Sequence, residues 1–500
     1  MEPLPTRTDQ TAPQRPDHVL APRRGGAASA PDHRLRTWTL VVVSLTQLLV
    51  VLDGTIVGVA LPHAQAELGL TDSARQWVVT AYALAFGSLL LLGGRIADYA
   101  GRKRTFLVGL VGFGVASVLG GVAADGATLL AARAGQGAFA ALMAPAALAI
   151  LTVTFPSGRE RNKAFALFGA VSGAGSAIGL LLGGVLTQYL DWRWCLLVNV
   201  PFVVVGVVAG LSLLRESRAE GDRRYDVPGA LTVTAGFALL VHGLTLIENA
   251  DGLGRAVTLV AAGLACLLAF VVIERRSPNP LLPLRILTDR VRAAALTVQA
   301  LVGAVMMGAM LYLAFHLQLV LHLGPLQAGA GTLPITISLM ATVPFSTKLL
   351  NEIGPRRQLV FGPLISAAGV VLLFTRISAD GSYWTQVLPA IVVFGVGMGL
   401  TMVPLQNLAL LGVAGHDAGA ASAAATAANQ LGGSIGLAVL TSVYVAAVEG
   451  RSVPTALVDG YAHVFAGAAA LLVVAGLVAL VVVPRATRLL GSDAAAPAVH

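Results

Sequence analysis

Two side chains in this sequence could carry charge chemistry inside a membrane. Asp53 and Arg133 are the only acid and the only base deep within its long apolar segments. A charge in hydrocarbon costs about 3 kcal/mol, so it is normally retained only where it has a function. A buried carboxylate beside a guanidinium can take up and release a proton as its surroundings change. The competing interpretation is a structural ion pair that fixes helix packing.

The two residues are expected to lie at similar depth. Asp53 precedes the outer end of the first apolar segment, and Arg133 follows the outer start of the fourth. At 1.5 Å per helical residue, they lie about 12 and 9 Å below the same surface. We therefore expect them to meet inside the protein, where Gly54 and Gly58 allow close backbone approach.

Composition assigns the chain to the multi-pass, all-α membrane proteins. It has 500 residues, of which 56% are hydrophobic and 12% charged, and its mean hydropathy is +0.79. A membrane-spanning helix needs about 20 apolar residues, and the segments lack the alternation of barrel strands. The expected spans are 37–61, 76–96, 105–124, 127–154, 164–188, 194–214, 228–249, 255–273, 291–317, 326–349, 358–378, 384–411, 418–446 and 462–483.

The net charge of +8 reflects membrane topology and not nucleic-acid binding. Lys and Arg concentrate in the two tails and in alternate loops, whereas the opposite loops hold five arginines. This asymmetry predicts that both termini are cytoplasmic and that the number of spans is even. Anionic membrane lipid is the expected partner of the basic loops.

An internal repeat organises the spans into two halves. Gly179 and Gly183 recur 253 residues later as Gly432 and Gly436, and the same offset carries Gly101 onto residue 354. Such an offset indicates two duplicated six-helix halves. It pairs Asp53 with residue 306, a methionine, so the second half has no equivalent acid. The expected divisions are a disordered tail at 1–36, a six-helix bundle at 37–214, a linker with two further spans at 215–290, a second bundle at 291–483 and a tail at 484–500.

A very short basic turn joins the second and third spans. Gly101 permits a tight reversal, and Asp98 is expected to cap or complement the positive end of the third helix. The spacing is more specific than a positive-inside turn requires. We expect this turn to gate the cytoplasmic side through Gly94, Asp98, Gly101, Arg102 and Lys103.

These motifs together resemble the major facilitator superfamily, in particular its fourteen-helix drug:proton antiporters. The turn at 94–104 resembles the superfamily signature, 52–62 the first-helix motif and 129–137 the fourth-helix motif. The resemblance implies two six-helix bundles plus two central helices, with Asp53 and Arg133 coupling transport to protons. The helix-five antiporter motif is represented by Gly175, Gly179, Gly183 and Gly184.

One position departs from this family pattern. The helix-five motif normally has proline after its central glycine, and this chain has Leu180 there. Proline would remove a backbone hydrogen bond and bend the helix. Without it, any bend must come from the glycines, which weakens the inference of antiport.

The family plan places the substrate between the halves, at mid-membrane. Amides and adaptable apolar side chains would suit a neutral, zwitterionic or singly charged lipophilic molecule. Helix packing is the competing role for each of these residues. The candidate lining residues of the second half are Gln299, Met306, Met307, Tyr312, Gln406, Asn407, Asn429 and Gln430.

The preferred function is therefore export of drugs or secondary metabolites in exchange for protons, by a monomer in the cytoplasmic membrane. An importer or facilitator of an organic solute is the alternative on the same fold. A membrane enzyme or sensor is disfavoured, because the sequence has no His/Cys/acid cluster, phosphate-binding loop or soluble domain. No cofactor and no metal are expected.

Overall fold

The computed structural model describes residues 33–155, 158–218, 226–246, 253–278, 280–378, 381–411, 413, 418–448 and 455–484. Within these ranges the chain is helical and has no β-strand. Thirteen helices are long and apolar enough to cross a membrane. The tails predicted at 1–36 and 484–500 fall almost entirely outside the described residues.

The long helices confirm the fourteen expected spans. Two of them share the label α12 and are separated at Gly354, whose φ of 77° and ψ of 164° are not helical. The helices are α1 (His33–Leu68), α2 (Asp72–Ala100), α3 (Arg102–Gly121), α4 (Gly126–Thr154), α5 (Gly158–Tyr189), α6 (Trp194–Leu197), α7 (Asn199–Leu213), α8 (Val227–Thr245), α9 (Leu253–Arg276), α10 (Leu284–Thr288), α11 (Arg290–Phe315), α12 (Pro325–Phe374), α13 (Leu388–Leu410), α14 (Ala418–Val448) and α15 (Thr455–Val482). Wider π-helical turns, His316–Val320 and Tyr383–Val387, extend α11 and precede α13.

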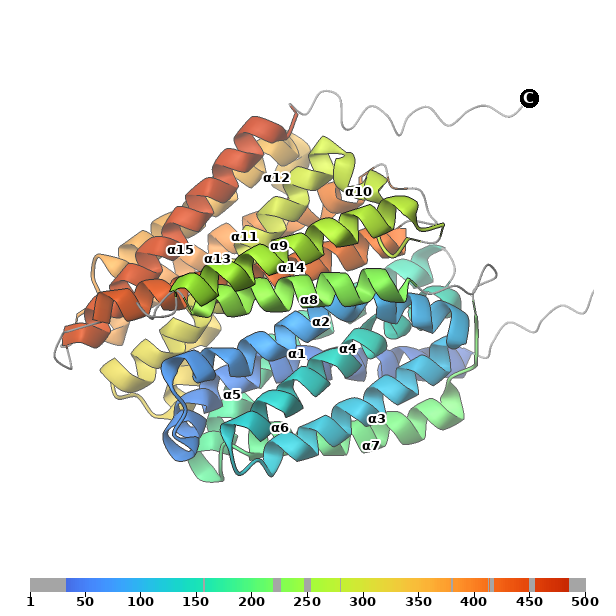
Figure 1. Ribbon diagram of the computed structural model, residues 1–500, viewed down its shortest axis with the longest axis horizontal. Helices are drawn as coiled ribbons and strands as arrows, with labels where there is room; N and C mark the ends of the chain where they lie inside the picture. The colour runs from blue at the N-terminus through green and yellow to red at the C-terminus, as the bar shows by residue number, and fades with distance from the viewer. Residues whose placement is uncertain are drawn as a thin grey trace, which may run out of the picture.

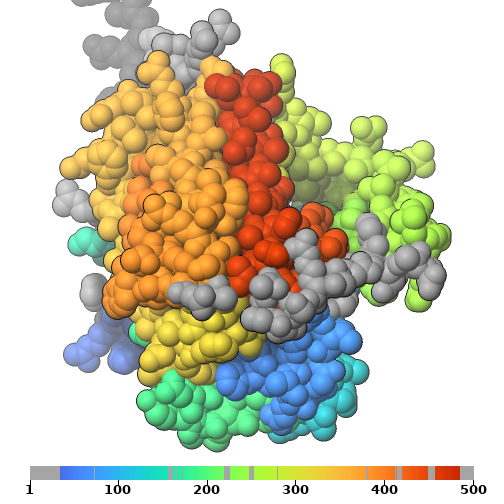
Figure 2. Space-filling model, turned by 90° about the vertical axis from the view of Figure 1, so that its left-hand side faces the viewer, coloured from blue at the N-terminus to red at the C-terminus, as the bar shows by residue number. Residues whose placement is uncertain are grey.

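The two groups of six spans meet along two seams. In Figure 1, α1 to α7 form the lower part of the molecule and α11 to α15 the upper part, with α8 and α9 between them. The halves contact each other where α2 packs on α14 and where α5 packs on α12. Figure 2 shows the green α8–α9 region as a lobe on one side. The inserted pair is therefore peripheral to both groups.

The repeated glycines pack each half internally. A Cβ on Gly183 would lie 2.9 Å from Ile56 of α1, and one on Gly436 would lie 2.5 Å from the Ala304 Cα of α11. These two close approaches lie within one half, whereas α5 and α14 also pack across the halves, on α12 and α2.

The residue offset between equivalent positions of the two halves differs between their first helices and their fifth helices. Gly179 packs on Leu52, whereas Gly432 packs on Ala300. By this packing register the counterpart of Asp53 is Leu301, so the expected pairing with Met306 was wrong. The segment between the paired helices is longer in the second half, which the sequence offset alone does not show. The second-half counterpart of Asp53 is apolar in either alignment.

One end of the bundle is rich in arginine, and we call it the arginine-rich end. It contains the α2–α3 turn, the start of α5, the α9–α11 linker and the interruption of α12. Both reversals expected from the repeat use a glycine with positive φ, 120° at Gly101 and 77° at Gly354. The opposite end contains the α1–α2 connection and the start of α12.

Candidate functional site

The acid and base expected from the sequence are in direct contact. Arg133 of α4 donates from Nη1 to Asp53 Oδ2 of α1 at 2.7 Å. The two side chains are 1% and 0% exposed. An ion pair this deeply enclosed retains most of its Coulomb attraction, because water and salt screen it little.

Three further polar side chains complete the carboxylate's surroundings. Asp53 Oδ1 accepts hydrogen bonds from Gln136 Nε2 at 2.9 Å and from Asn199 Nδ2 at 2.8 Å. Gln136 also accepts from Arg133 and donates to Ser117 Oγ of α3. Buried polar networks of this kind hold one arrangement when their members are paired.

Sequence reasoning missed these partners. The signal for Gln136 was its position three residues after Arg133, which places both on one face of a helix. Asn199 and Ser117 come from α7 and α3, and nothing in their local sequence shows that they converge on Asp53. Their convergence follows from the packing of four helices.

Arg133 separates Asp53 from a large cavity. Its Nε donates to the Val78 carbonyl of α2 at 3.0 Å, and its guanidinium carbon lies 4.5 Å from the centre of the Tyr82 ring. Arg133 and Tyr82 both line the cavity, whereas Asp53 does not. A change in the charge of Asp53 would therefore act directly on a residue of the cavity wall.

The cavity has a volume of about 1040 Å³ and lies between the two halves. Helices α1, α2, α4, α5, α11, α12, α13 and α14 contribute to its wall. It extends from Val59 and Ala314 to Asp98 and Arg102, so it reaches the arginine-rich end. Five residues expected to line it do so: Met306, Met307, Gln406, Asn429 and Gln430.

Three expected lining residues lie elsewhere. Gln299 is buried in α11, where its carbonyl faces Asn429. Tyr312 belongs to a buried aromatic cluster and donates to Thr441 Oγ1 at 2.9 Å. Asn407 is exposed and donates to the Val403 carbonyl of its own helix. These expectations failed because a polar residue's direction around its helix depends on neighbours that the sequence pattern does not identify.

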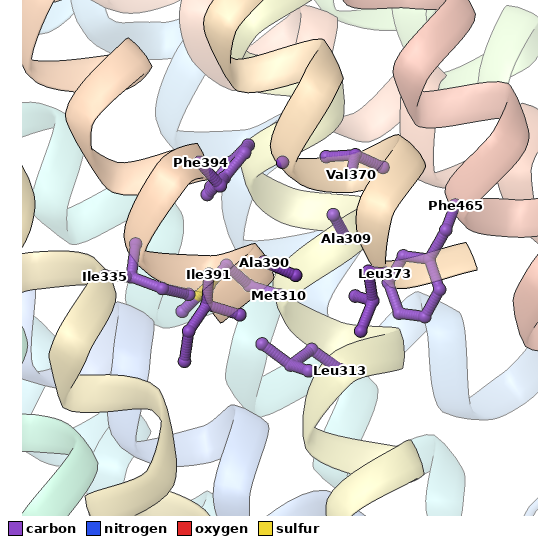
Figure 3. Close-up of a pocket in the computed structure, with 11 residues that line it drawn as sticks. Ala309, Met310, Leu313, Ile335, Val370, Leu373, Ala390, Ile391, Phe394 and Phe465 are labelled. Atoms are coloured by element: carbon purple, nitrogen blue, oxygen red, sulfur yellow. The ribbon is translucent and has the colours of Figure 1, made fainter. Parts of the chain in front are cut away.

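A second, much smaller pocket lies within the second half. Figure 3 shows its apolar lining, which includes Ile335, Phe394 and Phe465. Its volume is about 20 Å³, roughly that of a single water molecule. It is too small for an organic molecule, whereas the large cavity has room for one. No group of three His, Cys, Asp or Glu side chains suited to a metal occurs in the described ranges.

The α2–α3 turn lies at the mouth of the cavity. Gly94, Asp98 and Arg102 line it, and Arg102 donates to Asp98 at 2.9 Å. The expectation that Asp98 caps α3 was wrong. Glu216 instead accepts from the backbone N–H groups of Lys103 and Arg104, because the chain after α7 returns to this helix end.

The Lys103 side chain attaches the turn to α7, since its Nζ donates to the Leu211 carbonyl at 2.7 Å. Gly101 is required here for two reasons. Its φ of 120° is strained for other residues, and a Cβ would lie 2.7 Å from the Glu216 carboxylate. The absence of a side chain at Gly101 thus lets the Glu216 carboxylate reach the backbone N–H groups of the turn.

Gly101→Ala should lower the stability of the protein by about 1–3 kcal/mol, because alanine would be strained and would displace Glu216. Thermal unfolding in detergent would measure this loss. Gly169→Ala is the matched control, since Gly169 lies in α5 with nothing within 4 Å of an added Cβ. Equal unfolding temperatures for the two variants would contradict the role given to Gly101.

The helix-five motif contacts both halves. Gly175 approaches Leu48 of α1, where a Cβ would lie 3.1 Å from the leucine side chain. Gly184 faces α12, where a Cβ would lie 2.6 Å from the Leu326 Cα. The Leu180 carbonyl meets Gly329 of α12. The position without proline is therefore one of the closest contacts between the halves.

The end opposite the arginine-rich end is closed by contacts between the halves. The Arg75 guanidinium carbon of α2 lies 4.2 Å from the centre of the Phe315 ring of α11. Gln318 donates to the Val59 carbonyl, and Gln188 accepts from the backbone N–H of Leu326. These contacts must break before a molecule can leave the cavity at this end, whereas the cavity already reaches the arginine-rich end.

Comparison with known proteins gives a consistent assignment. The profile of the Major Facilitator Superfamily matches residues 43–437. The chain is 44% identical to the puromycin resistance protein of Streptomyces alboniger, over 90% of this chain and 91% of the relative. It is 38% identical to the cephamycin export protein of Amycolatopsis lactamdurans, over 89% and 93%.

Among solved structures, the crystal structure of a peptide transporter, POT, in complex with sulfate is similar in fold. The TM-score is 0.62 at 15% sequence identity, over 90% of this chain and 95% of that chain. At this identity the likeness concerns the fold alone.

Proposed function

The chain belongs to the major facilitator superfamily, and we propose that it exports lipophilic organic molecules in exchange for protons. It is a transporter of the cell membrane and not an enzyme. The observation that carries the proposal is the enclosed Asp53–Arg133 pair on the wall of a cavity large enough for an antibiotic. Relatives named for puromycin resistance and cephamycin export support the substrate class.

We place the arginine-rich end in the cytoplasm. The excess of Lys and Arg in its loops supports this orientation. The cavity then faces the cytoplasm, where an exporter collects its substrate. The contact between Asp98 and Arg102 lies within the α2–α3 turn at the open mouth. In the cytoplasm-closed state, we expect this turn to contact the second half.

Asp53 carries the proton in this scheme, and Arg133 is its partner. In the present arrangement Asp53 has three donors and matches an ionised carboxylate. Protonation would remove the attraction that holds Arg133, which also forms the cavity wall. Substrate and proton would thus influence each other through Arg133, as coupled exchange requires.

The cavity indicates the substrate's chemistry. Its wall contains Met306, Met307 and the amides of Gln406, Asn429 and Gln430. Such a wall accommodates varied apolar shapes and supplies neutral hydrogen-bonding groups. The second half adds no acid equivalent to Asp53. We therefore propose neutral, zwitterionic or singly charged lipophilic substrates, handled by a monomer.

Arg75→Met should make the outer end open more readily, because it removes the cation that contacts Phe315. About 1 kcal/mol of cation–π attraction would correspond to about a fivefold change in the open population. The measurement is labelling of Ala314→Cys, in the cavity wall, by an impermeant thiol reagent applied from outside. Arg193→Met is the control, since Arg193 also lies over an aromatic ring, Trp192, but within one half. Equal labelling of the two variants would contradict this role.

The function is tested in liposomes containing the purified protein and an imposed pH gradient. Puromycin, lincomycin, cephamycin and a monovalent lipophilic dye form the panel. Export predicts uphill accumulation of at least one compound on the acidic side. No movement of any panel compound, or accumulation in the opposite direction, would contradict the proposal. The second outcome would favour an importer, the alternative on this fold.

A further inference from the structure

The inserted helices α8 and α9 cover one of the two seams between the halves. The Trp77 ring of α2 meets the His242 ring of α8 edge-on, with their centres 5.8 Å apart. Ser442 of α14 donates to the Leu244 carbonyl of α8 at 3.4 Å. Helix α8 thus contacts both helices of the α2–α14 seam. Figure 1 shows α8 and α9 lying along this side of the molecule.

Towards the arginine-rich end, α9 and the linker after it fill the space beside this seam. Phe270 of α9, Leu282 of the linker and Ile286 of α10 are at most 7% exposed. They form one hydrophobic cluster with Ala421 and Ala424 of α14. Leu91 of α2 packs against the same cluster, so the inserted segment joins the two helices of the seam.

Polar contacts fix the linker in this position. The buried Glu274 carboxylate accepts from the backbone N–H groups of Leu281 and Leu282 at 3.2 and 3.1 Å. Arg95 of α2 donates to the Pro280 carbonyl at 2.8 Å. Leu281 and Pro283 line the large cavity. The linker is therefore part of the cavity wall, attached to the first half.

No helix of the described ranges covers the opposite seam, between α5 and α12, in this way. A Cβ on Gly173 of α5 would lie 3.3 Å from Met340 of α12. Gly169 lies one turn nearer the arginine-rich end on the same face of α5. A Cβ there would have nothing within 4 Å. Among the described residues, the α5–α12 contact is therefore looser at Gly169 than at Gly173.

We propose that the inserted pair and its linker close the α2–α14 side of the cavity to lipid, so that lipophilic molecules reach the cavity from the bilayer through the α5–α12 side. This inference rests on the proposed function for its substrate, but its geometry does not. It assigns a role to the two helices that the six-plus-six plan leaves unexplained. Lipid-dissolved substrate would approach from one side of the molecule only.

The first test measures lipid access and needs no substrate. Phe165 of α5 and Leu91 of α2 both line the cavity, on opposite sides. Each is replaced by cysteine in the full-length protein. Cys266, which is partly exposed, is changed to serine, and Cys195 is kept because it is buried. A fluorophore attached to each cysteine is then exposed to nitroxide-bearing phospholipid in liposomes. Quenching should be several-fold stronger at position 165 than at position 91, and equal or reversed quenching would overturn the proposal.

Truncating side chains of the inserted segment should abolish the difference in quenching between positions 165 and 91. Leu282→Ala combined with Phe270→Ala is expected to raise quenching at position 91 towards the level at position 165. Leu282→Ala alone provides a milder version if the double variant does not fold. Phe345→Ala removes an exposed aromatic side chain of α12, outside the inserted segment, so it is the matched control and should leave quenching at position 91 unchanged. If these variants fold and quenching at position 91 is unchanged, the inserted segment does not shield the α2–α14 side of the cavity from lipid.

A transport measurement separates this inference from the proposed function. Gly169→Trp should slow export of a lipophilic panel compound several-fold by narrowing the uncovered seam. Gly254→Trp is the control, since Gly254 is exposed in α9, outside the cavity lining, with nothing within 4 Å of an added Cβ. Equal slowing by both variants would overturn the access route. Failure of every panel compound to move would contradict the function and leave the quenching result standing.

Discussion

Asp53→Asn is expected to abolish export against a gradient while exchange of substrate down its own gradient continues. Asparagine is nearly the same size as aspartate and can still accept from Gln136 and Asn199, but it cannot bind the transported proton. Uptake driven by a pH gradient should fall to that of liposomes without protein. Counterflow of labelled substrate, which needs no proton, should persist and show that the variant is folded.

Glu67→Gln is the matched control for this variant. Glu67 accepts from Arg193 at 2.6 Å, but the carboxylate is 48% exposed at the outer end of α1. An exposed pair contributes at most about 1 kcal/mol and has no access to the cavity. Glu67→Gln should export at the normal rate. Unimpaired uphill export by Asp53→Asn would remove Asp53 from the coupling mechanism.

Arg133→Leu is expected to cause the second large effect, a loss of about 3–5 kcal/mol of stability. The substitution leaves the Asp53 carboxylate buried with amide partners alone and also removes the bond to the Val78 carbonyl. Thermal unfolding in detergent should show the loss directly. Export should fail as well, because the coupled partner is absent.

The double variant Asp53→Asn, Arg133→Leu should recover much of that stability, because it no longer contains a buried unpaired charge. Arg193→Leu, which disrupts a pair whose carboxylate is 48% exposed, should cost clearly less than Arg133→Leu. If the double variant is no more stable than Arg133→Leu, the loss comes from packing and not from the uncompensated carboxylate.

The sequence allowed the spans to be predicted because the bilayer constrains them strongly. Each helix must satisfy its own backbone and present about 20 apolar residues. The same reasoning placed a break between residues 349 and 358, and the two helices that make up α12 meet there, at Gly354.

The charged residues of the candidate site could be predicted from the sequence, whereas its neutral residues could not. Asp53 and Arg133 could be paired because a charge at depth needs a partner. Gln299 and Tyr312 carry no such requirement, and both are buried outside the cavity lining, where Tyr312 donates to Thr441. Glu216 was missed because it lies far along the chain from the α3 terminus that it caps.

The central claim is that the proton exchanged for substrate is bound by Asp53. The most direct measurement is simultaneous recording of substrate and proton flux in liposomes that contain a trapped pH-sensitive dye. The wild-type protein should move protons opposite to substrate, and Asp53→Asn should move substrate down its gradient without any proton flux. Proton flux that accompanies substrate equally in both proteins would contradict the claim.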